Sequence, residues 1–299
     1  MTHTKEDIIR IAKKNELTLD ENTIEFVNIG LDFQVVFGVD KAGKSWVLRL
    51  PRRKDAFIKT MQEKETLDML NDAELPFEVP NWEIYSDELI GYPILRGDLA
   101  VETDPETQET HWHFSENNVP KNFTDSLGKA LAALHSLSEK VGFNQPLTHS
   151  DIKTDMRRRM EAVRESYEID EMLWLRWQNW LNNDELWPTQ AGFIHGDLYP
   201  GHMLLDEEYS VVGIIDWTEA RVSDISNDFT AHYMLFGEKE LEKLLASYQA
   251  AGGYTWPKMK EHIIELLSTQ AITLAEFGES SGLDEYKQIA KDMLKNGDG

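Results

Sequence analysis

The spacing of apolar positions divides the chain into a β-rich N-terminal region and a mainly helical remainder. An amphipathic helix is predicted over residues 5–15, and three β-rich runs follow at residues 23–30, 33–40 and 45–51. The sequence DKAG at residues 40–43 is typical of a turn. The three runs are therefore expected to form an antiparallel meander.

The apolar period changes to that of a helix after the meander. Within residues 54–73 the apolar positions recur at helical spacing: Phe57, Met61, Leu67 and Leu70. Residues 78–95 alternate again and predict a hairpin that turns at Ser86 and Asp87. These elements together predict a small lobe made of strands and one helix.

The rest of the chain predicts a larger lobe that is mainly helical. Residues 98–119 are rich in acids and lack a period, so they are expected to form an exposed excursion. Helical spacing begins at Phe123 and is interrupted near residues 191–216 by short strand-like pieces. The last predicted helices cover residues 238–250, 257–277 and 283–294. The expected fold class is α+β, with a first lobe over residues 1–97 and a second over residues 98–299.

Composition narrows the possible partners. The 299 residues are 41% apolar, which is enough for a substantial core. There are 30 Lys and Arg residues against 54 Asp and Glu residues, and the net charge of −24 argues against nucleic acid and favours cationic ligands. No cysteine is present, so a metal site must use oxygen or imidazole ligands.

The sequence also bears on location and assembly. The N-terminus lacks the apolar core of a signal peptide, and no run approaches the roughly 20 apolar residues of a membrane span. We therefore expect a cytoplasmic protein without a membrane partner, and we expect a monomer.

The stretch FIHGDLYPGHMLL, residues 193–205, holds the densest candidate chemistry. Its glycine and proline residues force a loop, which would hold Asp197 outward. A second apolar run, VVGIIDW, leads to Asp216. In this arrangement two carboxylates could converge, one to orient or deprotonate a hydroxyl and one to hold a divalent cation, as phosphoryl transfer requires. His202 could complete the metal site.

HGDLYPGH followed by IIDW resembles the catalytic loop and metal-binding segment of the aminoglycoside phosphotransferase family, whose members are relatives of protein kinases and phosphorylate small-molecule hydroxyls. The resemblance implies a bilobal protein-kinase-like fold. It also implies that Arg49 in WVLRLP contacts nucleotide phosphates and pairs with Glu63 in QEKETLDML. Lysine is usual at that strand position, so Arg49 is a departure that keeps the charge but adds a planar head. LGKALAALHSL resembles a large-lobe helix of the family and gives His135 a packing role.

Five stretches resemble a narrower group, the macrolide 2′-phosphotransferases: GLDFQVVFGVD, SWVLRLPRR, HGDLYPGH, IIDWTEARVSDISND and AGGYTWP. Such enzymes transfer the γ-phosphate of a nucleotide, usually GTP, to the 2′-hydroxyl of the desosamine sugar of erythromycin-like antibiotics. The resemblance implies GTP as the donor, with ATP as a second donor, and Mg²⁺ as the cofactor. It also implies a macrolide and a purine nucleotide as partners and antibiotic resistance as the role. His202 agrees with this group, whereas asparagine is usual there in the broad family.

The resemblance implies a role for each candidate residue. Asp197 would accept a hydrogen bond from the acceptor hydroxyl and take its proton late, while Asp216 and His202 would hold Mg²⁺. Nucleotide contacts are expected from the strand–helix pair, from a phosphate-covering turn and from a hinge: Arg49, Glu63, Gly30, Phe33, Tyr92, Pro93 and Ile94. A macrolide has an apolar ring and a cationic dimethylamino group, so its site needs acids beside an apolar wall. The candidates for that site are Trp217, Asp224, Asp228, Met234, Phe236, Glu276 and Phe277.

Other functions stay open at this point. The acceptor could be another hydroxylated small molecule such as an aminoglycoside, because the nucleotide machinery would be the same. A nucleotide-binding scaffold without activity is disfavoured by the presence of Asp197 and Asp216. A metal hydrolase built on His195, Asp197 and His202 would need further ligands, for which the sequence offers no obvious candidate.

Several candidates also have structural interpretations. Asp228 could anchor a loop by accepting backbone hydrogen bonds, and Arg49 with Glu63 could be an ordinary ion pair. The tryptophans of residues 172–188 are expected to pack helices together.

Overall fold

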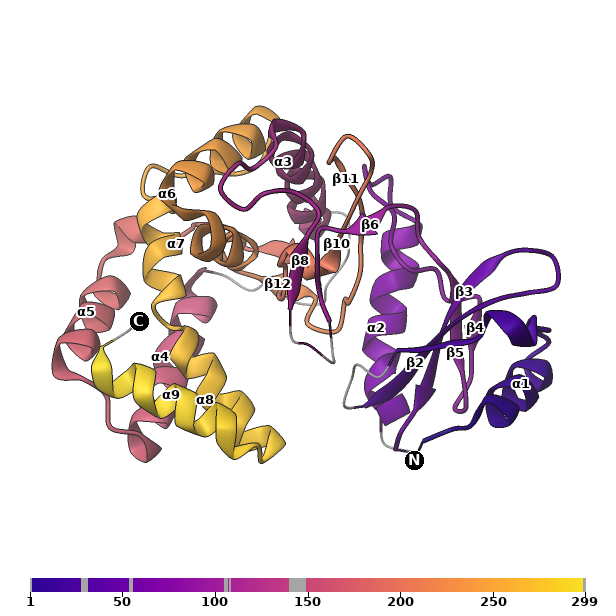
Figure 1. Cartoon of the computed structure of the whole chain (residues 1–299). Coiled ribbons are helices and arrows are strands. Elements are labelled where there is room, and N and C mark those ends of the chain that lie inside the picture. Colours follow the sequence, from indigo (N-terminus) through magenta and orange to yellow (C-terminus); the bar gives the residue numbers. More distant parts are fainter. Residues whose placement is uncertain are drawn as a thin grey trace. The chain divides into compact units, whose positions relative to one another are not determined.

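The chain forms two compact units. The structure is a computed structural model (Figure 1), and it describes residues 2–27, 32–53, 56–104, 107, 109–139 and 149–297. The first unit comprises Met1–Ser115 and Pro200–Ala220, and the second comprises Glu116–Tyr199 and Arg221–Gly299. The chain therefore enters the first unit a second time at Pro200 and leaves it after Ala220.

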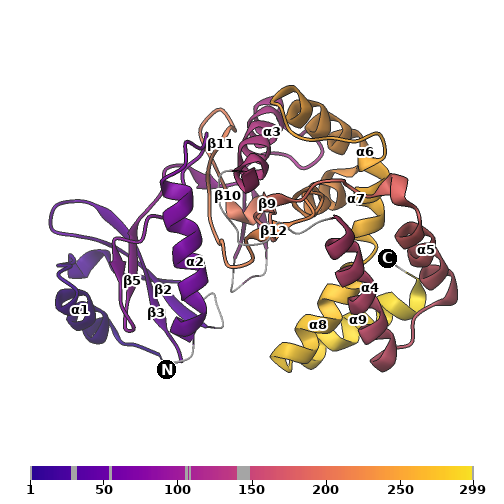
Figure 2. The ribbon, with the colours of Figure 1, turned by 180° about the vertical axis from the view of Figure 1, so that it is seen from behind.

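The first unit is built on a five-stranded antiparallel sheet in the order β1-β2-β3-β5-β4. Its strands are β1 (Glu25–Val27), β2 (Phe33–Val39), β3 (Ser45–Pro51), β4 (Ile84–Tyr85) and β5 (Ile90–Pro93). Helix α1 (Lys5–Lys14) lies on one side of this sheet and α2 (Ala56–Asn71) on the other (Figures 1 and 2). The predicted meander, hairpin and two helices are confirmed.

Alternation along β3 explains why each face receives a different helix. Leu48 and Leu50 are fully buried and share a core cluster with Ile11 of α1. Arg49 lies between them in sequence and points to the opposite face, where it meets Glu63 of α2. The sheet thus has one mainly apolar face and one face that carries charge.

Helix α2 buries a different set of side chains than the sequence predicts. Leu67 and Leu70 are buried as expected, but Met61 is 57% exposed, while the polar Thr60 and Glu63 are buried. The reason is the polar character of the facing sheet surface. Arg49 pairs with Glu63, and the Thr60 hydroxyl lies 3.2 Å from the Tyr85 hydroxyl.

A second sheet, in the order β11-β10-β6, completes the first unit together with a small hairpin. The strands of these two structures are β6 (Asp98–Leu99), β7 (Val101–Thr103), β8 (Thr110–Trp112), β10 (Met203–Leu205) and β11 (Val211–Ile214). Glu78 ties β11 to the chain before β4, because its N–H donates to the Val212 carbonyl at 2.8 Å and its carbonyl accepts from the Ile214 N–H at 3.0 Å.

The prediction that residues 98–119 form an exposed excursion is wrong in part. Ala100, Val101 and Phe114 are buried, and β6 pairs with β10. The buried positions are few and stand among acids, so no period reveals them. Because of this pairing the compact first unit extends to Ser115, well beyond residue 97. The division into a nucleotide-binding and a substrate-binding lobe stays a prediction.

The second unit is mainly helical. Its α-helices are α3 (Lys121–His135), α4 (His149–Ser166), α5 (Glu171–Asn182), α6 (Asn227–Ala250), α7 (Met259–Leu267), α8 (Gln270–Ser281) and α9 (Asp284–Asn296). Strands β9 (Gly192–Ile194) and β12 (Arg221–Ser223) form an antiparallel pair in this unit. Short 3₁₀ helices are η1 (Glu21–Thr23) and η4 (Pro200–His202) in the first unit, and η2 (Ser136–Glu139) and η3 (Asp184–Leu186) in the second. None of the helices described here has the length and apolar character needed to cross a membrane.

Two helix boundaries differ from prediction. Helix α6 begins at Asn227 rather than near residue 238, and Gly237 kinks it with a left-handed φ of 78° that glycine adopts without strain. The predicted helix over residues 257–277 is divided into α7 and α8. At the break, the hydroxyls of Ser268 and Thr269 bond to the carbonyls of Glu265 and Leu266 and so compete with the helical pattern.

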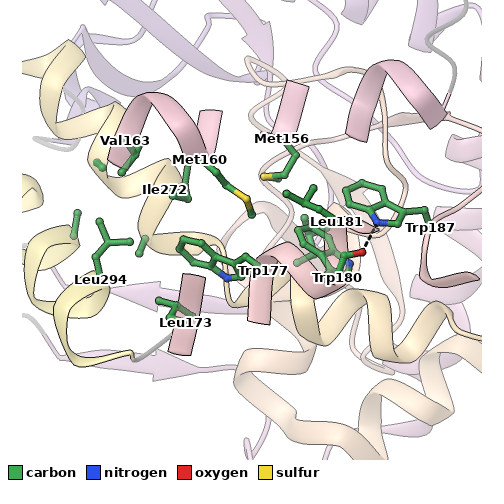
Figure 3. Close-up of a cluster of buried hydrophobic side chains, with 14 residues drawn as sticks. Met156, Met160, Val163, Leu173, Trp177, Trp180, Leu181, Trp187, Ile272 and Leu294 are labelled. Carbon is green, nitrogen blue, oxygen red and sulfur yellow. Dashed lines mark hydrogen bonds between the residues drawn. The ribbon is translucent and has the colours of Figure 1, made fainter. Parts of the chain in front are cut away.

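Tryptophans pack the helices of the second unit together, as predicted from residues 172–188. Trp177, Trp180 and Trp187 are at most 2% exposed and share one cluster with residues of α4, α8 and α9 (Figure 3). The Trp187 indole N–H donates to the Trp180 carbonyl at 3.0 Å, and the Trp177 N–H donates to the Ser268 hydroxyl at 2.9 Å. The rings thus contribute large apolar surfaces without leaving their polar atoms unpaired.

Candidate active site

The loop that carries Asp197 follows the buried strand β9 in the second unit. Gly196 has a φ of 86°, which turns the chain sharply after the strand. Asp197 is exposed, whereas His195 is fully buried. The backbone N–H of Asp197 donates to Nδ1 of His195 at 3.3 Å, so the histidine ring holds the loop in the manner that the sequence predicts.

Asp228, at the start of α6, anchors this loop. Its carboxylate accepts from the backbone N–H groups of His195 and Gly196, each at 2.9 Å. Nε2 of His135 lies 3.1 Å from the same carboxylate. Burial alone would raise the pKa of Asp228, but the hydrogen bond from His135, with the influence of His195 and the Gly196 N–H, lowers it below its usual value.

His135 does more than the packing role that the sequence predicts. Its Nδ1 lies 3.0 Å from the Tyr248 hydroxyl, so one ring bridges Tyr248 of α6 and Asp228. With Nε2 donating to the carboxylate, Nδ1 accepts from the phenol, and both ring nitrogens are satisfied. Burial raises the pKa of Tyr248, so this hydroxyl remains a donor.

Asp224, predicted as a substrate contact, is also buried and bonded. One of its oxygens lies 2.6 Å from Nε2 of His262, and the other accepts from the Ser226 N–H at 2.9 Å. Nδ1 of His262 in turn accepts from the Trp180 indole at 3.0 Å. Burial is the largest influence and acts to raise the pKa of Asp224, but His262 and the hydrogen bonds from Ser226 together outweigh burial, and the net shift is downward. This placement argues against direct substrate contact by Asp224, and the hydrogen bonds of Asp228 argue the same for that residue.

The second apolar run of the motif brings His202 and Asp216 side by side in the first unit. Met203 of β10 pairs with Ile214 of β11 in an antiparallel register. His202, directly before β10, therefore lies beside the residues that follow β11, which include Asp216. Nε2 of His202 lies 3.6 Å from Oδ2 of Asp216. Asp216 adopts a left-handed φ of 63°, a conformation that is uncommon for non-glycine residues and that Asp tolerates better than most.

The His202–Asp216 pair fits a divalent cation. Two ligands that each lie roughly 2.1 Å from one ion can be at most roughly 4.2 Å apart, which accommodates the spacing observed. The side chain of Asp216 is 47% exposed, so a metal can reach it. Mg²⁺ commonly takes one or two protein ligands and completes its shell with water and phosphate oxygens. Among the residues that the structure describes, no cluster of three or more potential metal ligands occurs.

Trp217, the residue after the metal-ligand candidate, is 1% exposed and lies in the core of the first unit. Its ring stacks on Phe77 with centroids 6.2 Å apart, and its N–H donates to the Ile214 carbonyl at 3.0 Å. This placement argues against Trp217 as a substrate contact and makes it a support for the segment that ends in Asp216.

Arg49 and Glu63 form the predicted pair. Nη1 of Arg49 lies 2.8 Å from Oε1 of Glu63, and the two side chains are 17% and 3% exposed. Burial is the largest influence and acts to lower the pKa of Arg49, but the charge and hydrogen bond of Glu63, together with the influence of Tyr92 and Asp216, outweigh burial and raise that pKa. Asp216 therefore acts electrostatically on the strand–helix pair. Burial raises the pKa of Glu63 despite the opposing charge of Arg49.

Two aromatic rings flank the Arg49 guanidinium. Its central carbon lies 4.7 Å from the centroid of the Phe33 ring and 5.4 Å from that of Trp82. Phe33 belongs to the predicted cofactor set, whereas sequence reasoning missed Trp82. Gly30, predicted in the phosphate-covering turn, lies outside the described residues.

The predicted hinge follows directly on the sheet. Tyr92 and Pro93 end β5, and Tyr92 is opposite Val47 on the face that carries Arg49. Burial raises the pKa of Tyr92 to about 12, so its phenol is neutral. Ile94 is 44% exposed, and its N–H donates to the Ser45 carbonyl at 3.0 Å. That N–H is therefore already bonded to protein, and a purine would have to use other backbone groups of the hinge.

The remaining substrate candidates lie on helices of the second unit. Met234 is 50% exposed on α6, while Phe236 is half-buried with its ring edge-on to Phe123. Glu276 is held by Arg159 in a bidentate ion pair at 2.6–3.0 Å, so its charge is already matched. Phe277 is 41% exposed and lies against Tyr286.

Comparison with known proteins identifies the family. The sequence profile described as the phosphotransferase enzyme family matches residues 23–262. The chain belongs to this phosphotransferase family. The enzyme class predicted from Asp197 and Asp216, a phosphotransferase, is thereby confirmed.

Individual relatives cover nearly the whole chain of this phosphotransferase. A solved structure of a macrolide 2′-phosphotransferase type I is 37% identical, with a TM-score of 0.88 and 99% of each chain covered. The apoenzyme of macrolide 2′-phosphotransferase MphH from Brachybacterium faecium is 30% identical, with a TM-score of 0.88 and 97% of each chain covered. An uncharacterized protein of Bacillus subtilis, YcbJ, is 35% identical over 96% of this chain and 95% of its own.

More distant structures are alike in fold alone. The GDP and kanamycin complex of APH(2")-IIia is 18% identical, with a TM-score of 0.71 and 97% of each chain covered. The bilobal kinase-like fold class expected from the sequence, a small antiparallel sheet with a helix and a larger helical part, is confirmed.

Proposed function

We propose that this phosphotransferase transfers the γ-phosphate of GTP to the 2′-hydroxyl of the desosamine sugar of macrolide antibiotics and so confers macrolide resistance. The observation that carries the proposal is the likeness to two macrolide 2′-phosphotransferases along essentially the whole chain at 30% and 37% identity. The GDP and kanamycin complex of APH(2")-IIia, by contrast, is only 18% identical. A cytoplasmic location and a monomeric state stay predictions.

Asp197 is the proposed catalytic residue. Its side chain is exposed on a loop whose backbone N–H groups donate to the buried side chains of His195 and Asp228. A group held in this way can accept a hydrogen bond from the acceptor hydroxyl, align its oxygen with the phosphorus and receive the proton late in the transfer. Phosphoryl transfer has a loose transition state, so positioning matters more here than base strength.

Asp216 and His202 are the proposed residues that hold Mg²⁺. When bound, the cation would neutralise charge on the nucleotide phosphates. The Asp216 carboxylate is oriented by the Thr218 hydroxyl, which donates to its Oδ1 at 2.8 Å and leaves Oδ2 toward His202. His202 ends η4 directly before β10, and its carbonyl accepts from the Ile215 N–H at 3.0 Å.

The nucleotide is proposed to bind over the face of the sheet that carries Arg49. Glu63 keeps that guanidinium in place through their ion pair, and Arg49 in turn contacts the phosphates. Tyr92, on the same face, is a neutral and bulky neighbour of the hinge. We propose that it disfavours adenine and so gives GTP the advantage over ATP.

The proposal is tested by acceptor-dependent release of GDP. The protein, Mg²⁺ and GTP are incubated with erythromycin, with erythromycin acetylated at the 2′-oxygen, or with kanamycin. GDP release that requires erythromycin with a free 2′-hydroxyl is the expected result. Release with kanamycin alone would assign the enzyme to aminoglycosides, and equal release with the acetylated macrolide would place the reaction at another hydroxyl.

A further inference from the structure

The arginine at the strand position where lysine is usual sits in an aromatic slot. Phe33 begins β2, and Trp82 lies just before β4, so the two rings come from strands on either side of β3 and β5. The guanidinium carbon of Arg49 is within 5.4 Å of both ring centroids. All three side chains are largely buried.

The slot fits a planar cation. A guanidinium can stack on aromatic faces and still donate in its own plane, whereas an ammonium is a compact point charge at the end of a flexible stem. Stacking against two rings would restrict the plane of the head group, whereas the bond to Glu63 alone leaves it freedom to rotate.

Hydrogen bonding in the slot is incomplete. Within the part of the chain that the structure describes, Nη1 is the atom of Arg49 that bonds to protein, through Glu63. Oε2 of Glu63 and the indole Nε1 of Trp82 are buried, and no described residue bonds to them. Buried polar groups are almost always satisfied in a working protein, so such groups gathered around one cation indicate that a polar ligand or water completes the site.

We propose that Phe33 and Trp82 are positioning residues that hold the Arg49 guanidinium in one plane, so that one edge binds Glu63 and the other addresses the nucleotide phosphates. The inference rests on the proposed function, which makes Arg49 a phosphate contact. It goes beyond that function by stating that this site is built for arginine and that lysine does not replace it.

Neighbouring side chains reinforce the slot. The Trp82 ring stacks on Tyr85 at 5.6 Å, and the Tyr85 ring lies 4.9 Å from Phe57 of α2. The Thr60 hydroxyl lies 3.2 Å from the Tyr85 hydroxyl. Trp82 is therefore supported, through Tyr85, by the helix that also supplies Glu63. Replacing the Trp82 ring removes its contact with the Arg49 guanidinium.

Nucleotide binding without an acceptor gives the test. Titration calorimetry with Mg²⁺ and a non-hydrolysable GTP analogue measures the Kd of the wild type and of the variants Arg49→Lys, Trp82→Leu and Phe33→Leu. Trp82→Leu and Phe33→Leu each lose a desolvated cation–π contact, and Arg49→Lys loses the planar head group; each variant is expected to weaken binding by about tenfold. Trp82→Phe keeps an aromatic face and is expected to recover most of the affinity lost in Trp82→Leu.

The double variant Arg49→Lys with Trp82→Leu distinguishes positioning from general damage. If Trp82 acts through the guanidinium, its loss adds little once Arg49 has been replaced. Steady-state kinetics should agree, with a raised KM for GTP and an unchanged KM for the acceptor. Lys44→Ala, which removes a cation–π contact to Trp46 on the same strand, serves as the matched control and should leave GTP affinity unchanged.

Two results would overturn the inference. One is Arg49→Lys binding the nucleotide as tightly as the wild type; the other is equal losses from Trp82→Leu in the presence and absence of Arg49. Thermal unfolding verifies that each variant is folded. If Trp82→Leu does not fold, Phe33→Leu tests the slot through its second aromatic ring. If the variants weaken nucleotide binding as expected but no macrolide is phosphorylated, only the proposed acceptor is refuted. A wild type that binds no purine nucleotide would refute both proposals.

Discussion

Two buried carboxylates, Glu63 in the first unit and Asp228 in the second, are paired with basic side chains but differ in how completely they are bonded. Both oxygens of Asp228 accept hydrogen bonds, from His195, Gly196 and His135. In Glu63, Oε1 is bonded to Arg49, while Oε2 has no partner among the described residues.

The pKa values of these two acids follow the difference. Burial is the largest influence on each and would raise both. The hydrogen bonds and charge around Asp228 reverse that effect and lower its pKa, whereas Arg49 does not reverse it for Glu63. Asp228 is thus a fully bonded structural anchor, while the unbonded Oε2 of Glu63 supports the proposal that a nucleotide binds beside this residue. A buried ion pair is therefore a better candidate for a ligand-binding site when one of its polar atoms has no hydrogen-bond partner in the protein.

The largest effect is expected from Asp228→Ala. The change leaves the N–H groups of His195 and Gly196 and the ring of His135 buried without their acceptor. Removing one partner of such a buried network costs about 3–5 kcal/mol, and turnover should be lost because the Asp197 loop is released. Urea unfolding measures the free energy, and GDP release measures turnover. Stability within about 1 kcal/mol of the wild type would show that Asp228 is no anchor.

Asp197→Asn should separate catalysis from stability. The side chain is exposed, so the free energy of unfolding should not change. The amide oxygen of asparagine can still accept a hydrogen bond but cannot take the proton of the hydroxyl, so kcat should fall roughly 100- to 10,000-fold. Stopped assays of GDP release with erythromycin give the rate. Wild-type turnover in this variant would remove Asp197 from the mechanism.

Glu63→Gln should change binding more than folding. The amide keeps the shape of the side chain but lacks the charge that holds Arg49, so GTP affinity is expected to fall about tenfold. Because burial already disfavours the Glu63 carboxylate, the free energy of unfolding should change by less than about 1 kcal/mol. A large loss of stability with intact GTP affinity would make Glu63 an anchor like Asp228.

The smallest effect is a difference in pH dependence. The lowered pKa of Asp228 contributes stability above its unfolded pKa of about 3.9, and that contribution is lost as the pH falls through the folded value. Asp228→Asn should therefore show a shallower loss of stability below about pH 4 than the wild type.

Glu63 should have the opposite sign. Its raised pKa favours the fold below the unfolded value of about 4.3, and this contribution is lost as the pH rises through the folded value. Relative to the wild type, Glu63→Gln should gain stability as the pH rises. Urea unfolding at a series of pH values measures both slopes, and the same sign for the two variants would contradict the comparison.

Local patterns in the sequence were sufficient to predict most of the first unit. Alternation over β2 and β3 predicted the meander, and helical spacing predicted α2, whereas the pairing of Arg49 with Glu63 was predicted from the resemblance to the phosphotransferase family. The motif around Asp197 predicted an exposed carboxylate on a loop because glycine and proline define such a loop locally.

Contacts between residues far apart in the sequence could not be predicted. Asp224 follows a strand and looks like a site residue, but His262, 38 positions later, makes it a buried structural acid. Trp82 occupies an ordinary apolar position before a hairpin, and only the folded sheet brings it to Arg49. Glu276 likewise has the charge expected of a site residue, yet Arg159, 117 positions earlier, already pairs with it.

The position of the transferred phosphate tests the central claim most directly. Erythromycin incubated with the protein, Mg²⁺ and GTP is purified and studied by ³¹P–¹H correlation spectroscopy, with kanamycin treated in parallel. The account predicts a phosphorus that couples to the proton on C2′ of desosamine, and kanamycin without phosphate. Phosphate on kanamycin alone, or on another oxygen of the macrolide, would contradict it.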